Sequence, residues 1–274
     1  MKNQETQRFS CDGSAQDVCR KFNNGADSLA VLEEKIPLLL EHQPYAVGMS
    51  VVDPRTAGMA AEMVGYMLDK GFRYLHLGVN FCKTAPWTKE SMSSLEAEYK
   101  KLAEMYITQT RNERKLYFSS FDMKILSHLK GESYNVDRAR MNMNQPSVAP
   151  DGTIYTLSKH LNNPVFAVGD VFAGIDAKKH KAIFERGRVP AEPCQRCAIK
   201  SRCNYAYDNL NNDGDVIVDD ITPVQCAHER MITPIADYVA QTLYTERSAL
   251  FMHKHYNEMF PFLSALEEGM FNGL

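Results

Sequence analysis

The sequence has 274 residues, of which 44% are hydrophobic, and this suffices for one large domain or two modest ones. Its formal net charge of -3 provides no electrostatic attraction to nucleic acid or to an anionic membrane surface, so we expect neither partner. No apolar run approaches the roughly 18 to 20 residues that span a bilayer, and the N-terminus lacks the apolar segment of a secretory signal. We therefore expect a cytoplasmic protein.

Helix and strand patterns alternate through the first half of the chain. In chain order they predict a helix over 28–41 with a kink at Pro37, a strand over 45–53, a helix over 56–70, a strand over 72–80 and a helix over 91–108. Strands that are joined through helices pair in parallel, with right-handed crossovers. The predicted fold class of the first half is therefore α/β with a parallel sheet.

The pattern changes after about residue 131, and we place a boundary between 130 and 145. Short strands are predicted within 147–160 and 166–174, and a loop rich in Asn, Asp and Gly is predicted around 211–215. Residues 228–270 have a largely helical pattern. The second half is thus predicted to be a smaller domain with short strands, followed by C-terminal helices.

Four of the seven cysteines lie within 33 positions of one another. The string PCQRCAIKSRC places Cys194, Cys197 and Cys203 in the spacing Cys-x2-Cys-x5-Cys, and Cys226 follows after 22 further residues. An odd number of cysteines with this clustering argues against a secreted disulfide framework. Thiolates bind both zinc and iron–sulfur clusters. We therefore predict that these four residues are the ligands of one metal centre.

Around these cysteines the sequence resembles radical S-adenosyl-L-methionine (SAM) peptide-modifying enzymes that carry a SPASM or related auxiliary-cluster domain. That domain has the pattern C-x2-C-x5-C-x3-C, preceded by G-x4-C and followed by a later cysteine. The four cysteines match the ligands of the second auxiliary cluster, whereas Tyr207 and Leu157 stand where the family has cysteines of the first cluster. The resemblance implies a domain with a single 4Fe–4S cluster, with Tyr207 and Leu157 filling the space of the lost one.

The N-terminal stretch 10–36 is similar to another segment of the same family, which reads roughly S-x-D-G, then H-D-x-x-R. Ser10 and Asp12 match its first part, and Arg20 matches the arginine of its second part after a short deletion. In the family, the serine and the arginine lie near the carboxylate and the ribose of SAM. The resemblance therefore implies that Ser10, Asp12 and Arg20 bind the cofactor, while no catalytic residue is assigned.

The family's radical-initiating motif C-x3-C-x2-C does not occur in this sequence. We therefore expect the C-terminal part of such an enzyme, unable by itself to cleave SAM. Its expected domains are a partial radical SAM (TIM-like) barrel over 1–135, a SPASM-like iron–sulfur domain over 136–235 and a helical segment over 236–274. Its expected partners are a peptide or protein substrate and either a missing N-terminal half or a redox partner.

Two other kinds of function remain open at this point. The chain could be a non-catalytic iron–sulfur module that binds a peptide or passes electrons to a partner. It could also be a structural domain that zinc stabilises, although a zinc ribbon usually has two Cys-x2-Cys turns and this sequence has one. The analysis of bound iron and acid-labile sulfide separates the zinc domain from the two iron–sulfur alternatives.

Overall fold

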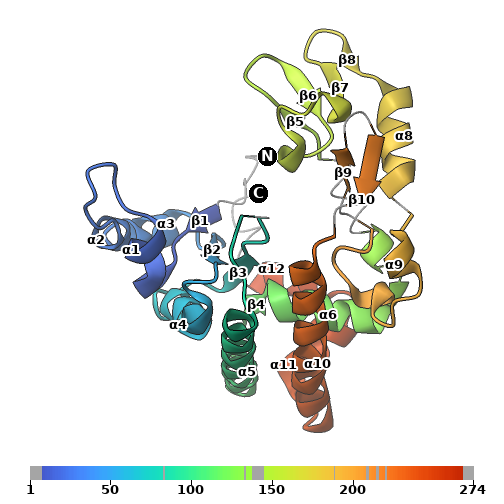
Figure 1. Ribbon diagram of the computed structural model, residues 1–274. Helices are drawn as coiled ribbons and strands as arrows, with labels where there is room; N and C mark the ends of the chain where they lie inside the picture. The colour runs from blue at the N-terminus through green and yellow to red at the C-terminus, as the bar shows by residue number, and fades with distance from the viewer. Residues whose placement is uncertain are drawn as a thin grey trace. The chain divides into compact units, whose positions relative to one another are not determined.

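The computed structural model describes residues 8–82, 84–132, 134–137, 145–187, 189–207, 210–213, 216–219 and 221–267 (Figure 1). The chain divides into two compact units. The first, which we call the α/β unit, comprises Met1–Ile125 and Met231–Leu274, and the second, which we call the cysteine unit, comprises Leu126–Arg230. The domain limits expected from the sequence, 1–135, 136–235 and 236–274, stay predictions.

The α/β unit contains a four-stranded sheet whose strands are all parallel. Its strands are β1 (Arg8–Ser10), β2 (Val47–Val52), β3 (Tyr74–Val79) and β4 (Tyr117–Phe118), and this is also their order across the sheet. The strands predicted over 45–53 and 72–80 are confirmed as β2 and β3. The parallel sheet predicted from the alternation of elements is confirmed as well.

Helices connect these strands and complete the unit. They are α1 (Gln16–Cys19), α2 (Leu29–Glu33), α3 (Ile36–His42), α4 (Ala60–Asp69), α5 (Lys89–Arg111), α6 (Ser119–Lys130), α10 (Pro223–Thr245), α11 (Ala249–Tyr256) and α12 (Phe260–Glu267). The helices α6 and α10 each continue from one unit into the other. The helices predicted over 56–70 and 91–108 are confirmed as α4 and α5.

The single kinked helix predicted over 28–41 is wrong, because the segment forms two helices, α2 and α3. Pro37 lies in the first turn of α3. A backbone N–H has no partner within the helix at that position, so proline is tolerated there without disturbing the helix. Proline therefore belongs to the start of a new helix here, where the sequence pattern suggested a bend within one.

The core of the α/β unit lies between the sheet and its helices. Leu75 and Leu77 of β3 are buried in it, together with Met67 of α4. Gly48 of β2 faces this packing, and a Cβ at its position would lie 2.9 Å from the Cε of Met67 on α4. Figure 1 shows α4 and α5 beside the strands that they connect.

A buried carboxylate joins four segments of the α/β unit. Asp122 of α6 is fully buried, and its Oδ2 accepts a 2.7 Å hydrogen bond from the Phe118 backbone N–H. Its Oδ1 accepts one from the Tyr106 hydroxyl at 2.6 Å and pairs with Lys254 Nζ at 2.6 Å and His255 Nε2 at 3.4 Å. Burial alone would raise the pKa of Asp122, but Lys254 and His255 hold this pKa at about 2. The carboxylate is therefore charged at neutral pH and fixes α11 to β4 and α5.

The cysteine unit contains an antiparallel sheet and a separate hairpin. The sheet is formed by β5 (Ser147–Val148), β6 (Thr153–Tyr155), β7 (Ala167–Asp170) and β8 (Gly174–Ile175), and the hairpin by β9 (Leu210–Asp213) and β10 (Val216–Asp219). Its further helices are α8 (Ala177–Gly187) and α9 (Glu192–Gln195). These elements confirm the short strands predicted for the second half of the chain.

A histidine links the hairpin of the cysteine unit to its sheet. The ring of His160 stacks on Phe166 with centroids 3.7 Å apart. Its Nδ1 shares a 2.7 Å hydrogen bond with the Thr156 hydroxyl, and its Nε2 lies 3.1 Å from the Leu210 carbonyl oxygen. Burial lowers the pKa of His160 to about 4. The imidazole is therefore neutral at neutral pH, which suits its place in a small apolar core.

Within the part of the chain that the structure describes, no helix is both long and apolar enough to cross a lipid bilayer.

We expect the Lys254→Met variant to destabilise the protein by about 3–5 kcal/mol, because it leaves the Asp122 carboxylate buried without its cation. The measurement is the free energy of unfolding from urea titration at neutral pH. Lys100→Met removes an exposed lysine that pairs with Glu96 on the same helix, and this control should leave the unfolding midpoint unchanged.

The Asp122 carboxylate should also make the stability of the wild-type protein depend on pH in acid. The pKa of Asp122 falls from 3.8 to about 2 on folding, so its stabilisation is complete above pH 3.8 and is lost as the pH falls through 2. Equal unfolding free energies for wild type and Lys254→Met at neutral pH would contradict this account of the network.

Candidate functional site

The four cysteines predicted to bind metal line one pocket of the cysteine unit. Cys194, Cys197, Cys203 and Cys226 surround an open space of about 350 Å³, part of which is solvent. We call this space the cysteine pocket. Its other lining residues are Ile199, Lys200, Tyr205, Ala206, Ile221, Gln225, Glu229 and Arg230. The structure therefore brings together all four residues that the sequence selected, although Cys226 is distant from the others in the chain.

Consecutive tight turns carry the first three cysteines. The N–H of Cys197 donates to the carbonyl of Cys194 at 3.1 Å, and the N–H of Lys200 donates to the carbonyl of Cys197 at 3.1 Å. The N–H of Cys203 then donates to the carbonyl of Lys200 at 3.3 Å. These hydrogen bonds join residues three apart, as in a helix with three residues per turn. Residues at intervals of three, which include the three cysteines, therefore lie on one side of the segment.

The fourth cysteine lies in the first turn of α10, whose start is fixed by a capping box. The Thr222 hydroxyl accepts a 3.2 Å hydrogen bond from the Gln225 N–H, and the Gln225 side chain accepts one of 2.8 Å from the Thr222 N–H. This reciprocal pair is the Thr-x-x-Gln form of the capping box. The sequence analysis overlooked this signal, which places Cys226 immediately after the helix start.

Hydrogen bonds reach sulfur atoms of the pocket from a side chain and from the backbone. The Arg230 guanidinium donates to Cys197 Sγ at 3.7 Å, and the backbone N–H of Tyr205 donates to Cys203 Sγ at 3.4 Å. Burial raises the pKa of the Cys226 thiol, Arg230 acts against this rise, and Cys197 adds to it. Donors directed at sulfur are an arrangement that stabilises thiolates, the form in which cysteine binds metal.

The chemistry of the donor set fits a thiolate-bound group. Among the described residues, however, no three His, Cys, Asp or Glu side chains lie close enough together to hold a single metal ion. The four cysteines therefore line the pocket, while the described side chains form no site for a single ion. Zinc needs all four sulfurs about 2.3 Å from one ion, whereas a cubane cluster places four irons between them.

The two residues expected to fill the space of a lost first cluster pack in different apolar clusters. Tyr207 packs with Ala206 and Cys203 beside the cysteine pocket, and its hydroxyl donates to Glu132. Leu157 instead packs against the small core of the antiparallel sheet. That these two residues fill the space of a lost first cluster stays a prediction.

The residues predicted to bind SAM lie at the carboxyl end of β1 in the α/β unit. Ser10 ends the strand and is exposed, and Asp12 follows it and is buried. The Asp12 carboxylate accepts hydrogen bonds from the Val51 N–H at 2.9 Å and from Arg20 Nε at 2.7 Å. Asp12 and Arg20 are thus in contact, and the Arg20 side chain is 38% exposed. Ligands of parallel α/β sheets bind at this edge, beyond the carboxyl ends of the strands.

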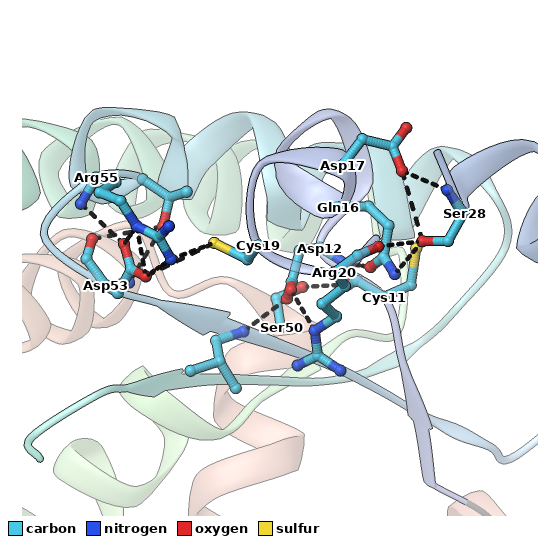
Figure 2. Close-up of polar contacts among 12 residues, drawn as sticks. Cys11, Asp12, Gln16, Asp17, Cys19, Arg20, Ser28, Ser50, Asp53 and Arg55 are labelled. Atoms are coloured by element: carbon cyan, nitrogen blue, oxygen red, sulfur yellow. Dashed lines mark hydrogen bonds and ion pairs between the residues drawn. The ribbon is translucent and has the colours of Figure 1, made fainter. Parts of the chain in front are cut away.

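Hydrogen bonds through polar side chains also link the backbone of Asp12 to the backbone of Arg20 (Figure 2). The Asp12 N–H donates to Gln16 Oε1 at 3.0 Å, and the Gln16 amide donates to the Ser28 hydroxyl at 3.0 Å. The Ser28 hydroxyl in turn donates to the carbonyl oxygen of Arg20 at 2.5 Å. The backbone that carries Arg20 is therefore held in place, while among the described residues its terminal amino groups make no hydrogen bond.

Sequence reasoning missed two polar groups on the same sheet. At the end of β2, the Arg55 guanidinium contacts both Asp53, at 2.6 Å, and Cys19 Sγ, at 3.3 Å (Figure 2). On β3, His76 Nδ1 lies 2.7 Å from the Ser119 hydroxyl, and burial lowers the pKa of this histidine. The alternation of β3, in which His76 stands between two buried leucines, was the available signal for a polar residue on the opposite sheet face.

These features define a two-unit α/β protein with a polar site at the strand ends and a pocket lined by thiols. No protein-family model matches the chain, and no significant match was found among curated proteins. Solved structures are nevertheless similar in fold. Native anSMEcpe with bound AdoMet has a TM-score of 0.65 and 15% identity over 86% of this chain and 67% of that chain.

Two further structures of the same protein contain a peptide as well as AdoMet. The anSMEcpe complexes with the Kp18Cys and Cp18Cys peptides each have a TM-score of 0.63 and 14% identity, over 87% of this chain and 69% of that chain. At this level of identity the likeness establishes the fold. Our chain is thus a mixed α/β protein whose fold is similar to that of anSMEcpe.

We expect Thr222→Ala to loosen the start of α10 by about 1 kcal/mol, because the helix loses its N-cap acceptor. Hydrogen exchange of the amides around Cys226 measures this local opening. Thr222→Ser keeps the hydroxyl and should exchange at the wild-type rate. The same exchange rate in Thr222→Ala would show that the capping box does not position Cys226.

Proposed function

We propose that this chain is the C-terminal part of a radical SAM enzyme that modifies a peptide or protein, and that it binds one auxiliary 4Fe–4S cluster. The observation that carries the proposal is that all four cysteines of the family pattern line a single pocket. In this proposal the parallel sheet corresponds to part of a radical SAM barrel, and the cysteine unit corresponds to a SPASM-like domain. The fold similarity to AdoMet-bound anSMEcpe supports it independently of the cysteines.

The cluster ligands in this proposal are Cys194, Cys197, Cys203 and Cys226. Four thiolates carry more negative charge than a cluster core neutralises, so hydrogen-bond donors near sulfur favour its binding. Arg230 and the Tyr205 N–H provide such donors. When bound, the cluster supplies one-electron redox chemistry, while the residues of the chain hold it and limit its contact with water.

SAM is proposed to bind at the carboxyl end of β1, next to Ser10, Asp12 and Arg20. An arginine suits the SAM carboxylate because its planar guanidinium donates two parallel hydrogen bonds. Arg20 uses its Nε for Asp12, which leaves its two terminal nitrogens oriented by a buried carboxylate. Ser10 lies two residues before Asp12 and is exposed, so its hydroxyl is available to the same ligand.

A peptide is the proposed substrate, because the similar anSMEcpe structures include peptide complexes. The chain contains no C-x3-C-x2-C motif, so we propose that the radical-initiating cluster is supplied by other residues than these 274. The partner is then a segment or subunit that carries that cluster. Reduced and reconstituted, the chain by itself should produce no 5′-deoxyadenosine from SAM.

We expect the replacement of any one of the four pocket cysteines by serine to abolish most of the bound iron. Each replacement removes one thiolate ligand, and the affinity for the cluster contributes to folding, so residues 190–230 should also lose stability. The measurement is iron and acid-labile sulfide per chain after anaerobic reconstitution. Cys82→Ser changes an exposed thiol of the α/β unit and should keep the wild-type iron content.

Full iron content in one of the four variants would remove that cysteine from the ligand set. One zinc ion per chain with no acid-labile sulfide would instead identify a structural zinc domain and overturn the proposed redox role.

We expect Arg20→Lys to weaken SAM binding about tenfold or more, because lysine cannot donate two parallel hydrogen bonds to a carboxylate. Isothermal titration with SAM measures the dissociation constant, and thermal unfolding without SAM verifies that the variant folds. Arg55→Lys, a change of the same kind at the neighbouring strand end, should keep wild-type affinity. Equal affinities for Arg20→Lys and wild type would place SAM elsewhere.

A further inference from the structure

Arg230 is placed on α10 so that its charge reaches the cysteine pocket. It lies one helical turn after Cys226, and residues four apart lie on the same face of a helix. Both side chains line the pocket, and Arg230 Nη2 is 3.7 Å from Cys197 Sγ. Arg230 therefore bridges the turn that carries Cys197 and the helix that carries Cys226.

Arg230 has no carboxylate partner among the residues that the structure describes. Among the described residues, its side chain forms no ion pair, and its hydrogen bond to Cys197 is the polar contact that it makes. Lys200 lines the same pocket but pairs with Glu132 Oε1 at 3.1 Å, so its charge is already offset. Of these two cations, Arg230 is therefore the one that contacts a pocket sulfur without also pairing with a described carboxylate.

The buried acid next to Arg230 in the sequence, Glu229, accepts a hydrogen bond from the backbone and does not pair with Arg230. Glu229 is 1% exposed, and its Oε2 accepts a 2.8 Å hydrogen bond from the Asn204 N–H. This bond ties α10 to the backbone that follows Cys203. Glu229 thus fixes the position of the helix relative to the first three cysteines, and this places Arg230 at Cys197.

We propose that Arg230 is a positioning residue that offsets the negative charge of the thiolates and raises the reduction potential of the bound cluster. This inference rests on the proposed function. Reduction adds one electron to a group that already has net negative charge, and a cation at a ligand sulfur stabilises the reduced state more than the oxidised one. Hydrogen bonds to cluster sulfurs raise the potential in the same direction.

The test compares three arginine variants of the full chain, reconstituted with iron and sulfide under anaerobic conditions. Arg230→Gln removes the charge at the pocket, and Arg230→Lys keeps it. Arg196→Gln removes the same charge from an exposed residue of the Cys-x2-Cys turn that does not line the pocket. The readouts are iron content and the midpoint potential from redox titration followed by electron paramagnetic resonance.

We expect Arg230→Gln to have a lower midpoint potential than wild type, Arg230→Lys to lie between them, and Arg196→Gln to equal wild type. Loss of iron in Arg230→Gln with rescue in Arg230→Lys also supports the inference, because charge then decides whether the cluster is held. Loss of iron in both Arg230 variants indicates a packing role and overturns it.

Equal potentials in Arg230→Gln and Arg196→Gln, with full iron in both, overturn the role of Arg230 while leaving the proposed function intact. A wild-type chain that binds zinc without sulfide, or no metal, overturns the proposed function itself.

Discussion

The Asp122 carboxylate is the contact on which the α/β unit depends most. Its two oxygens hold the backbone of Phe118, the hydroxyl of Tyr106, the Lys254 ammonium and the His255 imidazole, so one buried group joins β4, α5, α6 and α11. A buried carboxylate is costly without such partners, and removing one of them leaves a charge that cannot be solvated. Residues more than 130 positions apart are thereby fixed to one edge of the sheet.

That constraint has a consequence for the strand-end site. The sheet is open at β1 and β4, which are its first and last strands among the described residues. The Asp122 network secures the β4 side, while Asp12 secures the β1 side through the Val51 N–H and Arg20. Both edges are thus stabilised by buried acids. Ser10, at the carboxyl end of β1, is exposed next to this buried pair.

The cysteine unit is organised differently, because its apolar core is small. Among the described residues, the core against its antiparallel sheet comprises Ile154, Phe166, Val168, Ile183 and Leu210. His160 adds a stacked ring and two hydrogen bonds that join the hairpin to this core. A metal group held by four thiolates would contribute folding free energy where hydrophobic burial is limited.

The sequence by itself determined the parallel α/β character, the strands over 45–53 and 72–80, and the grouping of four cysteines, because periodicity and ligand spacing are local properties. It failed at Pro37, where one apolar pattern fits either one kinked helix or two helices. Only the tertiary structure decided that Asp122 meets Lys254, that Arg20 pairs with Asp12 and that Arg230 reaches Cys197. These pairs have no sequence signature, because each depends on how separate elements pack, and packing brings together residues that no local pattern relates.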